Sequence, residues 1–378
     1  MTSLWRSPRS RWAVPAGVAA VVAVVSLAPK AQADDHPVLA ARTAAELLAA
    51  VAGTTPPPGI SGTVSETVDL GLPSLPSMGG NSGAGTLSLL SLATGTHTVR
   101  VWAAGPDQQR VALLGQLAET EFVHNGADVW TYASSTHEVT HATVGAAGAA
   151  TAPDPSSVAQ TPQSIAAAAL AAVDPSTVVT VDSTATVAGR PAYRLVLTPR
   201  DTRTLVGSVR IAIDAQTSVP LQVQVFAKNQ SAAAIDVGFT SVSFAPVDAS
   251  VFAFTPPAGA TVTERTQAAD GTGSAGSAGT PQPRDKPGDA ATHPRVLGTG
   301  WTTVVSTTMP PSPPSATSTG DAAASSQQLL DQLSTPVAGG RVITTALVTV
   351  LLADDGTVYA GAVSAADLEQ VATSGRGL

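Results

Sequence analysis

The stretch between Thr96 and Thr143 consists of short runs of alternating apolar and polar residues that are separated by turn residues. Val99 and Val101 alternate with polar neighbours, and the later pair Asn125-Gly126 is a strong hairpin signal. Strands that recur this regularly indicate an antiparallel meander. A meander whose apolar side chains lie on one face must cover that face, so the nature of the cover is the main question this sequence poses.

Two helices and a second meander complete the pattern. Residues 43–46 (TAAE) form a capping box, and apolar residues at helical spacing follow it until Gly53. Thr161-Pro162 opens a second helix, with threonine as N-cap and proline at the first helical position. A second set of alternating strands then runs from Val178 to Phe254. The predicted order is helix, meander, helix, meander.

The N-terminus has the features of a secretory signal. Three arginines between residues 6 and 11 precede an apolar run over residues 13–28, and Ala31-Gln32-Ala33 matches an A-x-A cleavage site. We expect residues 1–33 to be a signal peptide and the protein to be exported to the extracellular or cell-envelope space. The alternative is an uncleaved leader that anchors the chain, for which the apolar run is short.

The composition excludes several classes of site. The chain has no cysteine, which rules out disulfides, zinc or haem sites built on cysteine, and a lipobox. Charged residues make up 12% of the chain and the net charge is −8, with no basic stripe, so nucleic-acid binding is not expected. Aromatic residues make up only 4%, so we expect a core of small and β-branched side chains.

Changes in composition divide the chain after the second meander. Residues 34–264 are predicted to form the main domain, and residues 265–300 a disordered linker rich in Gly, Ser and Pro. Residues 301–378 are a C-terminal extension with a disordered Pro-rich insertion at 310–320. Because this extension is small for an independent core, we expect its strands and helix to complete or flank the main sheet.

A family resemblance rests mainly on the second meander. It reads VAGRPAYRLVLTPR followed by SVRIAIDAQTSVPLQVQVF: a Gly-Arg turn, a strand ending in Thr-Pro-Arg, a strand ending in Ile-Asp and one beginning with Pro-Leu. Together with FVHNGADVWTY in the first meander, these motifs resemble the LolA/LolB family of lipoprotein carriers. The resemblance covers roughly Ala40 to Glu264. It is nearest to LolA-like exported proteins of high-GC Gram-positive bacteria, in a superfamily that also holds RseB, LppX and LprG.

This resemblance implies a mainly β fold: an antiparallel incomplete (half) β-barrel that is covered by helices and holds an acyl chain in a hydrophobic concavity, without a cofactor. The strand residues expected to line the concavity are Val99, Val101, Val111, Leu113, Phe122, Trp130, Leu195, Leu197, Ile211, Ile213, Val223 and Val225. The residues expected to form the lid are Leu47, Leu48, Val51, Ile165 and Leu170. The pattern alone favours a filled core for these strand faces, and it is the resemblance that favours a lined cavity.

One apparent catalytic motif is expected to be accidental. His137-Glu138-Val139-Thr140-His141 matches H-E-x-x-H, which binds zinc only on a helix, where both imidazoles reach one metal. Here it lies among β-forming residues, and on a strand the two histidines would be about 13 Å apart. No nucleophile elbow or phosphate-binding loop is present. We therefore expect neither a metal nor an enzyme, and we expect Arg100 and Arg110 to be solvated charges that point outward.

Three functions remain open at this stage. The first is a secreted carrier whose partner is a lipid or a lipoprotein acyl chain. The second is a sensor like RseB, which would bind a membrane-protein or anti-sigma partner. The third is a β scaffold with a filled core, and none of the three fixes the oligomeric state.

Export should remove the residues up to Ala33, because Ala31 and Ala33 fit the small-residue pockets of a signal peptidase. N-terminal sequencing of the secreted protein should therefore begin at Asp34. Recovery of a chain that begins at Met1 in the membrane fraction would show instead that the leader is kept as an anchor.

Overall fold

The computed structural model describes residues 37–72, 95–115, 118–143, 161–171, 173–266, 294–308 and 330–378. The predicted signal peptide and the predicted insertion at 310–320 lie outside these residues, as does most of the predicted linker. The two ends of that linker are ordered, because residues 265 and 266 end one strand and residues 295–297 form another. No helix in the described ranges is long and apolar enough to cross a membrane.

Both predicted meanders belong to one sheet of twelve strands, and β1 pairs with β11 to join them. From one edge to the other the strands are β12 (Thr261–Thr266), β6 (Glu138–Thr143), β5 (Asp128–Ala133), β4 (Glu119–Asn125), β3 (Gln108–Leu114), β2 (Gly95–Ala103), β1 (Ile60–Val68), β11 (Ala233–Ser243), β10 (Pro220–Ala227), β9 (Val206–Asp214), β8 (Arg190–Pro199) and β7 (Thr177–Val187). All neighbours are antiparallel except β12 and β6. The expected mainly β, open and helix-covered sheet is confirmed.

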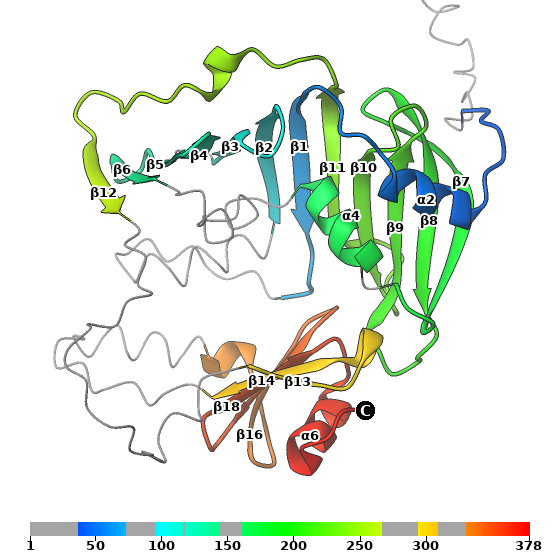
Figure 1. Ribbon diagram of the computed structural model, residues 1–378. Coiled ribbons are helices and arrows are strands. Elements are labelled where there is room, and N and C mark those ends of the chain that lie inside the picture. The colour runs from blue at the N-terminus through cyan, green and yellow to red at the C-terminus, as the bar shows by residue number, and fades with distance from the viewer. Residues whose placement is uncertain are drawn as a thin grey trace, which may run out of the picture.

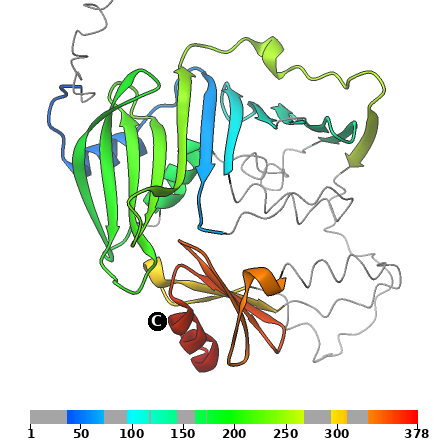
Figure 2. The same cartoon turned by 180° about the vertical axis from the view of Figure 1, so that it is seen from behind.

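The sheet is strongly twisted. In Figure 1 the strands β7–β11 stand upright, whereas β3–β6 are seen edge-on, and Figure 2 shows the same turn from behind. The helices α2 (Ala44–Ala52) and α4 (Pro162–Ala171) lie on one side of the sheet, over its upright half. We call this side the helix face and the opposite side the outer face.

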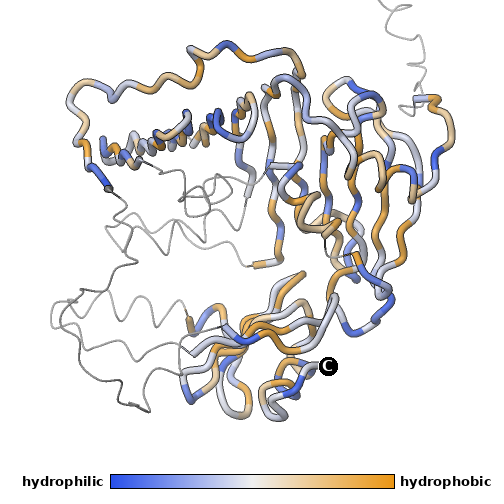
Figure 3. Tube along the Cα trace, in the orientation of Figure 1, coloured by the Kyte–Doolittle hydropathy of each residue, from blue (hydrophilic) through white to orange (hydrophobic). Residues whose placement is uncertain are grey.

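The two helices begin as their sequences indicate. The Thr43 amide donates to Oε2 of Glu46 at 2.7 Å, and the Glu46 amide donates to the Thr43 hydroxyl at 3.2 Å, which completes the capping box. Leu47 of α2 and Ala166 of α4 are fully buried in a core with apolar residues of β8–β11. The hydropathy colouring in Figure 3 follows this arrangement, with apolar segments of the strands lying behind the helices.

The C-terminal extension, which we expected to complete or flank the main sheet, forms a second sheet of its own. The strand order is β13 (Arg295–Leu297), β14 (Val304–Thr308), β18 (Thr357–Gly361), β17 (Thr349–Ala353), β16 (Gly340–Thr344) and β15 (Thr335–Val337). The helix α6 (Ala365–Ser374) closes one face of it. This second sheet and α6 share a hydrophobic core of their own, which consists of the buried residues Val304, Val342, Leu351, Val363, Leu368 and Val371.

This second sheet does flank the main one through a defined junction. Thr204 forms an isolated antiparallel bridge with Val363, and the Leu205 amide donates to the Ala362 carbonyl at 2.7 Å. Leu347 is buried in the main core, and the Trp301 indole donates to the Thr177 hydroxyl at 2.8 Å. The two cores therefore meet at the ends of β7 and β9.

A buried carboxylate holds the turn between β9 and β10. The Asp214 side chain is fully buried, and it accepts hydrogen bonds from the Arg190 guanidinium and from the backbone amides of Gln216 and Thr217. Burial, the largest influence, disfavours the charged form, but these donors outweigh it and lower the pKa of Asp214. A lowered pKa contributes stability that is present above the unfolded-state value of about 3.9 and is lost as the pH falls through the folded-state value.

Asp214→Asn should lower the free energy of unfolding at pH 7 by about 2 kcal/mol, because it removes a charged acceptor that five donor groups share. The loss should shrink at pH values below the folded pKa, where the wild-type carboxyl is also neutral. Urea denaturation of the parent and the variant, at pH 7 and at a pH below the folded pKa of Asp214, measures the difference in the free energy of unfolding. The control is Asp331→Asn, because the exposed ion pair of Asp331 with Arg341 should contribute less than about 1 kcal/mol. An equal loss of stability in both variants would contradict the stabilising role of the buried Asp214 carboxylate.

Candidate ligand-binding face

The register carries one apolar face across the whole sheet. On the first meander Val101 pairs with Val111, and Val111 with Phe122. On the second, Val223 pairs with Ile211, and Ile211 with Leu195. Because directly paired residues point to the same side, each set shares a face. Val64 of β1 pairs with Val99 on one side and with Phe239 on the other, so the two sets lie on the same helix face.

Every predicted cavity residue except Trp130 lies on this helix face. Those on the second meander pack under the helices, together with all five predicted lid residues. Leu47 is fully buried there, whereas Leu48, Val51, Ile165 and Leu170 are partly buried. This half of the face, over β7–β10, is therefore a core that two helices fill.

The other half of the helix face lies over β1–β6, and we call it the valine half. Its buried residues are Val64, Val99, Val101, Val111, Phe122 and Val129. These residues belong to a larger cluster that also includes Val237 and Phe239 of β11. Among the apolar residues of the described helices, Ile165 of α4 is the one that packs against this larger cluster as well as against the filled core. The valine half is thus continuous with the filled core but extends beyond the two described helices.

A polar pair marks one end of the valine half. Glu66 and His97 are directly paired on β1 and β2, two positions along the strands from the pair Val64 and Val99. Burial raises the pKa of Glu66, and the nearby imidazole of His97 partly offsets this effect. This end of the face therefore offers a carboxyl group and an imidazole next to apolar side chains.

Trp130 lies on the outer face, which corrects the expectation that it lines the concavity. Asn125 pairs with Asp128 across a two-residue loop, and this register places Thr131 opposite Phe122 and Trp130 opposite Val123. Its indole stacks on the His141 ring, with 3.8 Å between the centroids, and lies 5.4 Å from the Phe254 ring.

Arg110 also points to the outer face, but it is not a free solvated charge. Its Nε donates to Glu121 at 2.5 Å and its Nη1 donates to the Val251 carbonyl at 2.7 Å. Val251 belongs to the short helix η3 (Ala249–Phe252), whose Phe252 is buried against this side of the sheet. The segment that leads from β11 to β12 is therefore fastened over the outer face of β3 and β4.

The H-E-x-x-H residues are not helical, as expected. His137 ends a turn, and β6 begins at Glu138. Nε2 of His141 lies 2.9 Å from Oδ1 of Asp128, and its Nδ1 lies 2.7 Å from Oε2 of Glu264. Within the described ranges no group of three or more His, Asp or Glu residues has an arrangement that could hold a metal ion. Both ring nitrogens of His141 instead connect β5, β6 and β12.

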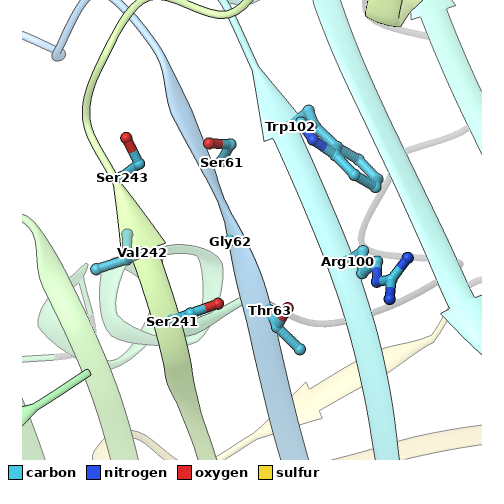
Figure 4. A pocket seen from close by; sticks show the side chains of 8 residues that line it. All are labelled: Ser61, Gly62, Thr63, Arg100, Trp102, Ser241, Val242 and Ser243. Atoms are coloured by element: carbon cyan, nitrogen blue, oxygen red, sulfur yellow. The ribbon is translucent and has the colours of Figure 1, made fainter. Parts of the chain in front are cut away.

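Sequence reasoning missed a polar depression on the outer face. It has a volume of about 470 Å³, and its lining residues come from β1, β2 and β11 (Figure 4). They are Ser61, Gly62, Thr63, Arg100, Trp102, Ser241, Val242 and Ser243. Alternation along β1 and β2 could have placed Ser61, Thr63, Arg100 and Trp102 on one face, but it could not have brought β11 beside them.

No family model and no curated protein matches this chain. Solved structures do. The complex of MucA and MucB from Pseudomonas aeruginosa matches over 87% of this chain and 95% of that chain, at 16% identity and a TM-score of 0.39. A LolA superfamily protein from Nitrosomonas europaea matches over 57% of this chain and 99% of that chain, at 10% identity and a TM-score of 0.22. A putative outer membrane lipoprotein-sorting protein domain from Vibrio parahaemolyticus matches over 55% of this chain and 94% of that chain, at 9% identity and a TM-score of 0.23.

At these identities and TM-scores the likeness concerns the fold alone.

The contacts of His141 predict a pH-dependent fastening of β12. Burial, the largest influence, disfavours the charged ring, but the bonds to Asp128 and Glu264 outweigh it and raise the pKa of His141. A raised pKa gives stability that is fully present below the unfolded value of about 6.5 and is lost as the pH rises through the folded value. Amide hydrogens of residues 261–266 should therefore exchange faster, after correction for intrinsic rates, as the imidazolium titrates.

His141→Phe keeps a ring against Trp130 but cannot bind either carboxylate, so it should abolish this pH dependence. The two ion pairs of His141 should stabilise β12 by only about 0.5–1 kcal/mol, because both carboxylates are more than half exposed. His124→Phe is the control, since His124 contacts the Gly126 carbonyl and not β12. Equal protection of β12 in both variants at pH 5 would contradict the fastening.

Proposed function

We propose that this chain is a non-catalytic, exported carrier that holds the acyl chain of a lipid or lipoprotein against the valine half of the helix face. The observation that carries the proposal is the mismatch between the apolar face and its helices. The face continues across β1–β6, whereas α2 and α4 pack over β7–β11. The side chains of this half are buried although the two helices do not extend over them, and an acyl chain has the chemistry to pack among them.

The residues of the valine half suit this cargo. Five of the six are valines, which leave more room above the sheet than Phe or Trp would, and no polar contact is needed along the alkyl tail. Burial of the cargo contributes about 0.8 kcal/mol for each methylene, so a long chain can bind through hydrophobic contact alone. Glu66 and His97 would then lie at the end where a polar headgroup leaves the apolar surface.

A second candidate function is regulation through a membrane-protein partner. The second sheet carries two directly paired valines, Val296 on its edge strand β13 and Val305 on the neighbouring strand β14, and both side chains are exposed. Exposed apolar pairs of this kind suit contact with another protein. Val296→Asp with Val305→Asp should then abolish co-purification of that partner without changing lipid binding. Retention of the partner by this variant would remove the candidate.

Two tryptophan substitutions on the same face test the carrier proposal. Val223 lies in the filled core beneath α4, so Val223→Trp should overpack it and cost about 1–3 kcal/mol or more. Val101 lies in the valine half, so Val101→Trp should occupy the volume meant for cargo at little cost in stability. The variant should therefore keep the thermal midpoint of the parent but lose affinity for 11-(dansylamino)undecanoic acid.

Thermal midpoints and probe fluorescence are measured for the parent and both variants. Val99→Ala serves as a further control, because enlarging a cargo volume should preserve probe binding, whereas it would leave a cavity in a filled core. The proposal fails if the parent binds no probe and Val101→Trp is destabilised as strongly as Val223→Trp. In that case the valine half is an ordinary packed core, and the chain is a β scaffold.

A further inference from the structure

The depression on the outer face, which we call the outer pocket, is built from two rows of directly paired residues. One row is Ser243, Ser61 and Trp102, and the other is Ser241, Thr63 and Arg100. Each row crosses β11, β1 and β2 in that order, with the side chains on one face (Figure 4). Strands lie about 4.8 Å apart and alternate residues about 6.8 Å apart, so the floor measures roughly 10 Å by 7 Å.

A β-bulge creates this floor. Between Thr63 and Val64 the register with β11 shifts, because Val64 pairs with Phe239 whereas Thr63 pairs with Ser241. Thr240 is the extra residue, and its hydroxyl donates to the Thr63 carbonyl at 3.2 Å. Without the shift, Ser241 and Ser243 would share the helix face with Phe239. The bulge turns both serines outward beside β1, and such re-aiming is common next to binding sites.

Most polar side chains of the outer pocket have no partner among the described residues; the exception is Ser243, whose hydroxyl accepts from the Ala245 amide at 3.3 Å. Among the described residues, none forms an ion pair or hydrogen bond with the Arg100 guanidinium, and none bonds the side-chain hydroxyls of Ser61, Thr63 or Ser241. Other arginines of the same face differ: Arg110 is held by Glu121, and Arg210 lies over the Phe226 ring at 4.3 Å. Within the described part of the chain, the pocket therefore combines the unpaired guanidinium of Arg100, the unpaired hydroxyls of Ser61, Thr63 and Ser241, and an indole.

We propose that the outer pocket binds an anionic saccharide: a sugar ring that carries a phosphate or a carboxylate. The hydroxyls of Ser61, Thr63 and Ser241 can donate to and accept from sugar hydroxyls in either direction. The indole of Trp102, over which Arg110 lies at 5.9 Å, offers an apolar surface for the C–H groups of the ring. Arg100 supplies a planar, charged donor for the anion, and the floor has about the size of one substituted ring.

Other ligand classes fit the outer pocket less well. An acyl chain would leave the hydroxyls unpaired, and inorganic phosphate alone would not use the indole. The pocket lies on the opposite side of the sheet from the valine half, because Arg100 and Trp102 alternate with Val99 and Val101 along β2. A ligand in the outer pocket therefore does not overlap with an acyl chain on the valine half.

Titration calorimetry of the full chain with four probes tests the proposal: mannose 6-phosphate, glucuronic acid, mannose and inorganic phosphate. At least one of the two anionic sugars should bind with a dissociation constant on the order of 1 mM or below, and at least tenfold more tightly than mannose or phosphate. The comparison between the first two probes decides whether the anion is a phosphate or a carboxylate.

Two variants assign the contacts, each with a matched control on the same face. Arg100→Ala should weaken binding of the anionic sugar at least tenfold, whereas Arg210→Ala, four strands away, should leave it unchanged. Thr63→Val keeps the shape of the side chain and removes its hydroxyl, so it should weaken binding two- to fivefold, which is about 0.4–1 kcal/mol. Thr67→Val, on the same strand and face, should have no effect.

Several results would overturn the inference. Equal binding of mannose would remove the role of the anion, and equal binding of inorganic phosphate would remove the role of the sugar. Absence of binding by both anionic sugars at about 10 mM, well above the weakest affinity expected, would remove the site altogether. Unchanged affinity in Arg100→Ala, with the thermal midpoint intact, would place any binding elsewhere.

Discussion

The two-residue period of β-structure, carried in register across twelve strands, is the constraint from which the rest of this structure follows. Each strand pair fixes which residues share a side, and a shift by one residue would send every apolar side chain to the other face. Because Val64 pairs with both Val99 and Phe239, the apolar faces of two separate meanders become one surface. A surface of that width cannot remain in water, so its cover determines what the protein can do.

Two kinds of cover divide this surface. Over β7–β10 the helices α2 and α4 supply large side chains, and Leu47, Leu195 and Ile211 reach full burial there. Over β1–β6 the apolar cluster has valines at most positions and meets the described helices only through Ile165. The first half is filled by the side chains of the helices and contributes stability, whereas the second is the half to which we assign the proposed acyl chain. The proposed acyl site and the filled core are thus parts of one continuous face.

Departures from regular pairing supply the polar features. The bulge at Thr240 brings two serines to the outer face beside Arg100 and Trp102. The parallel pairing of β12 with β6 covers one edge of the sheet, and His141 fastens it through Glu264. At the opposite edge the Thr184 hydroxyl donates to the Pro37 carbonyl, which draws the N-terminal segment along β7. Edges and bulges are where an otherwise repetitive sheet gains specific contacts.

The sequence by itself determined the local elements and the sidedness of most strands. Alternation identified both meanders, the Thr43 capping box located α2, and all predicted cavity residues except Trp130 share one face, since these features depend on neighbours in the chain. Only the tertiary structure decided which strands became neighbours across the centre, where Trp130 points, and that the C-terminal strands build a separate core around Val342 and Leu368. The tertiary structure also decided that β12 pairs with β6 and that Ser241 and Arg100 line the same pocket. The pairings of β1 with β11 and of β6 with β12 join residues more than a hundred positions apart, where local periodicity carries no information. The side of Trp130 instead depends on the register that the short loop between Asn125 and Asp128 sets, which alternation alone does not fix.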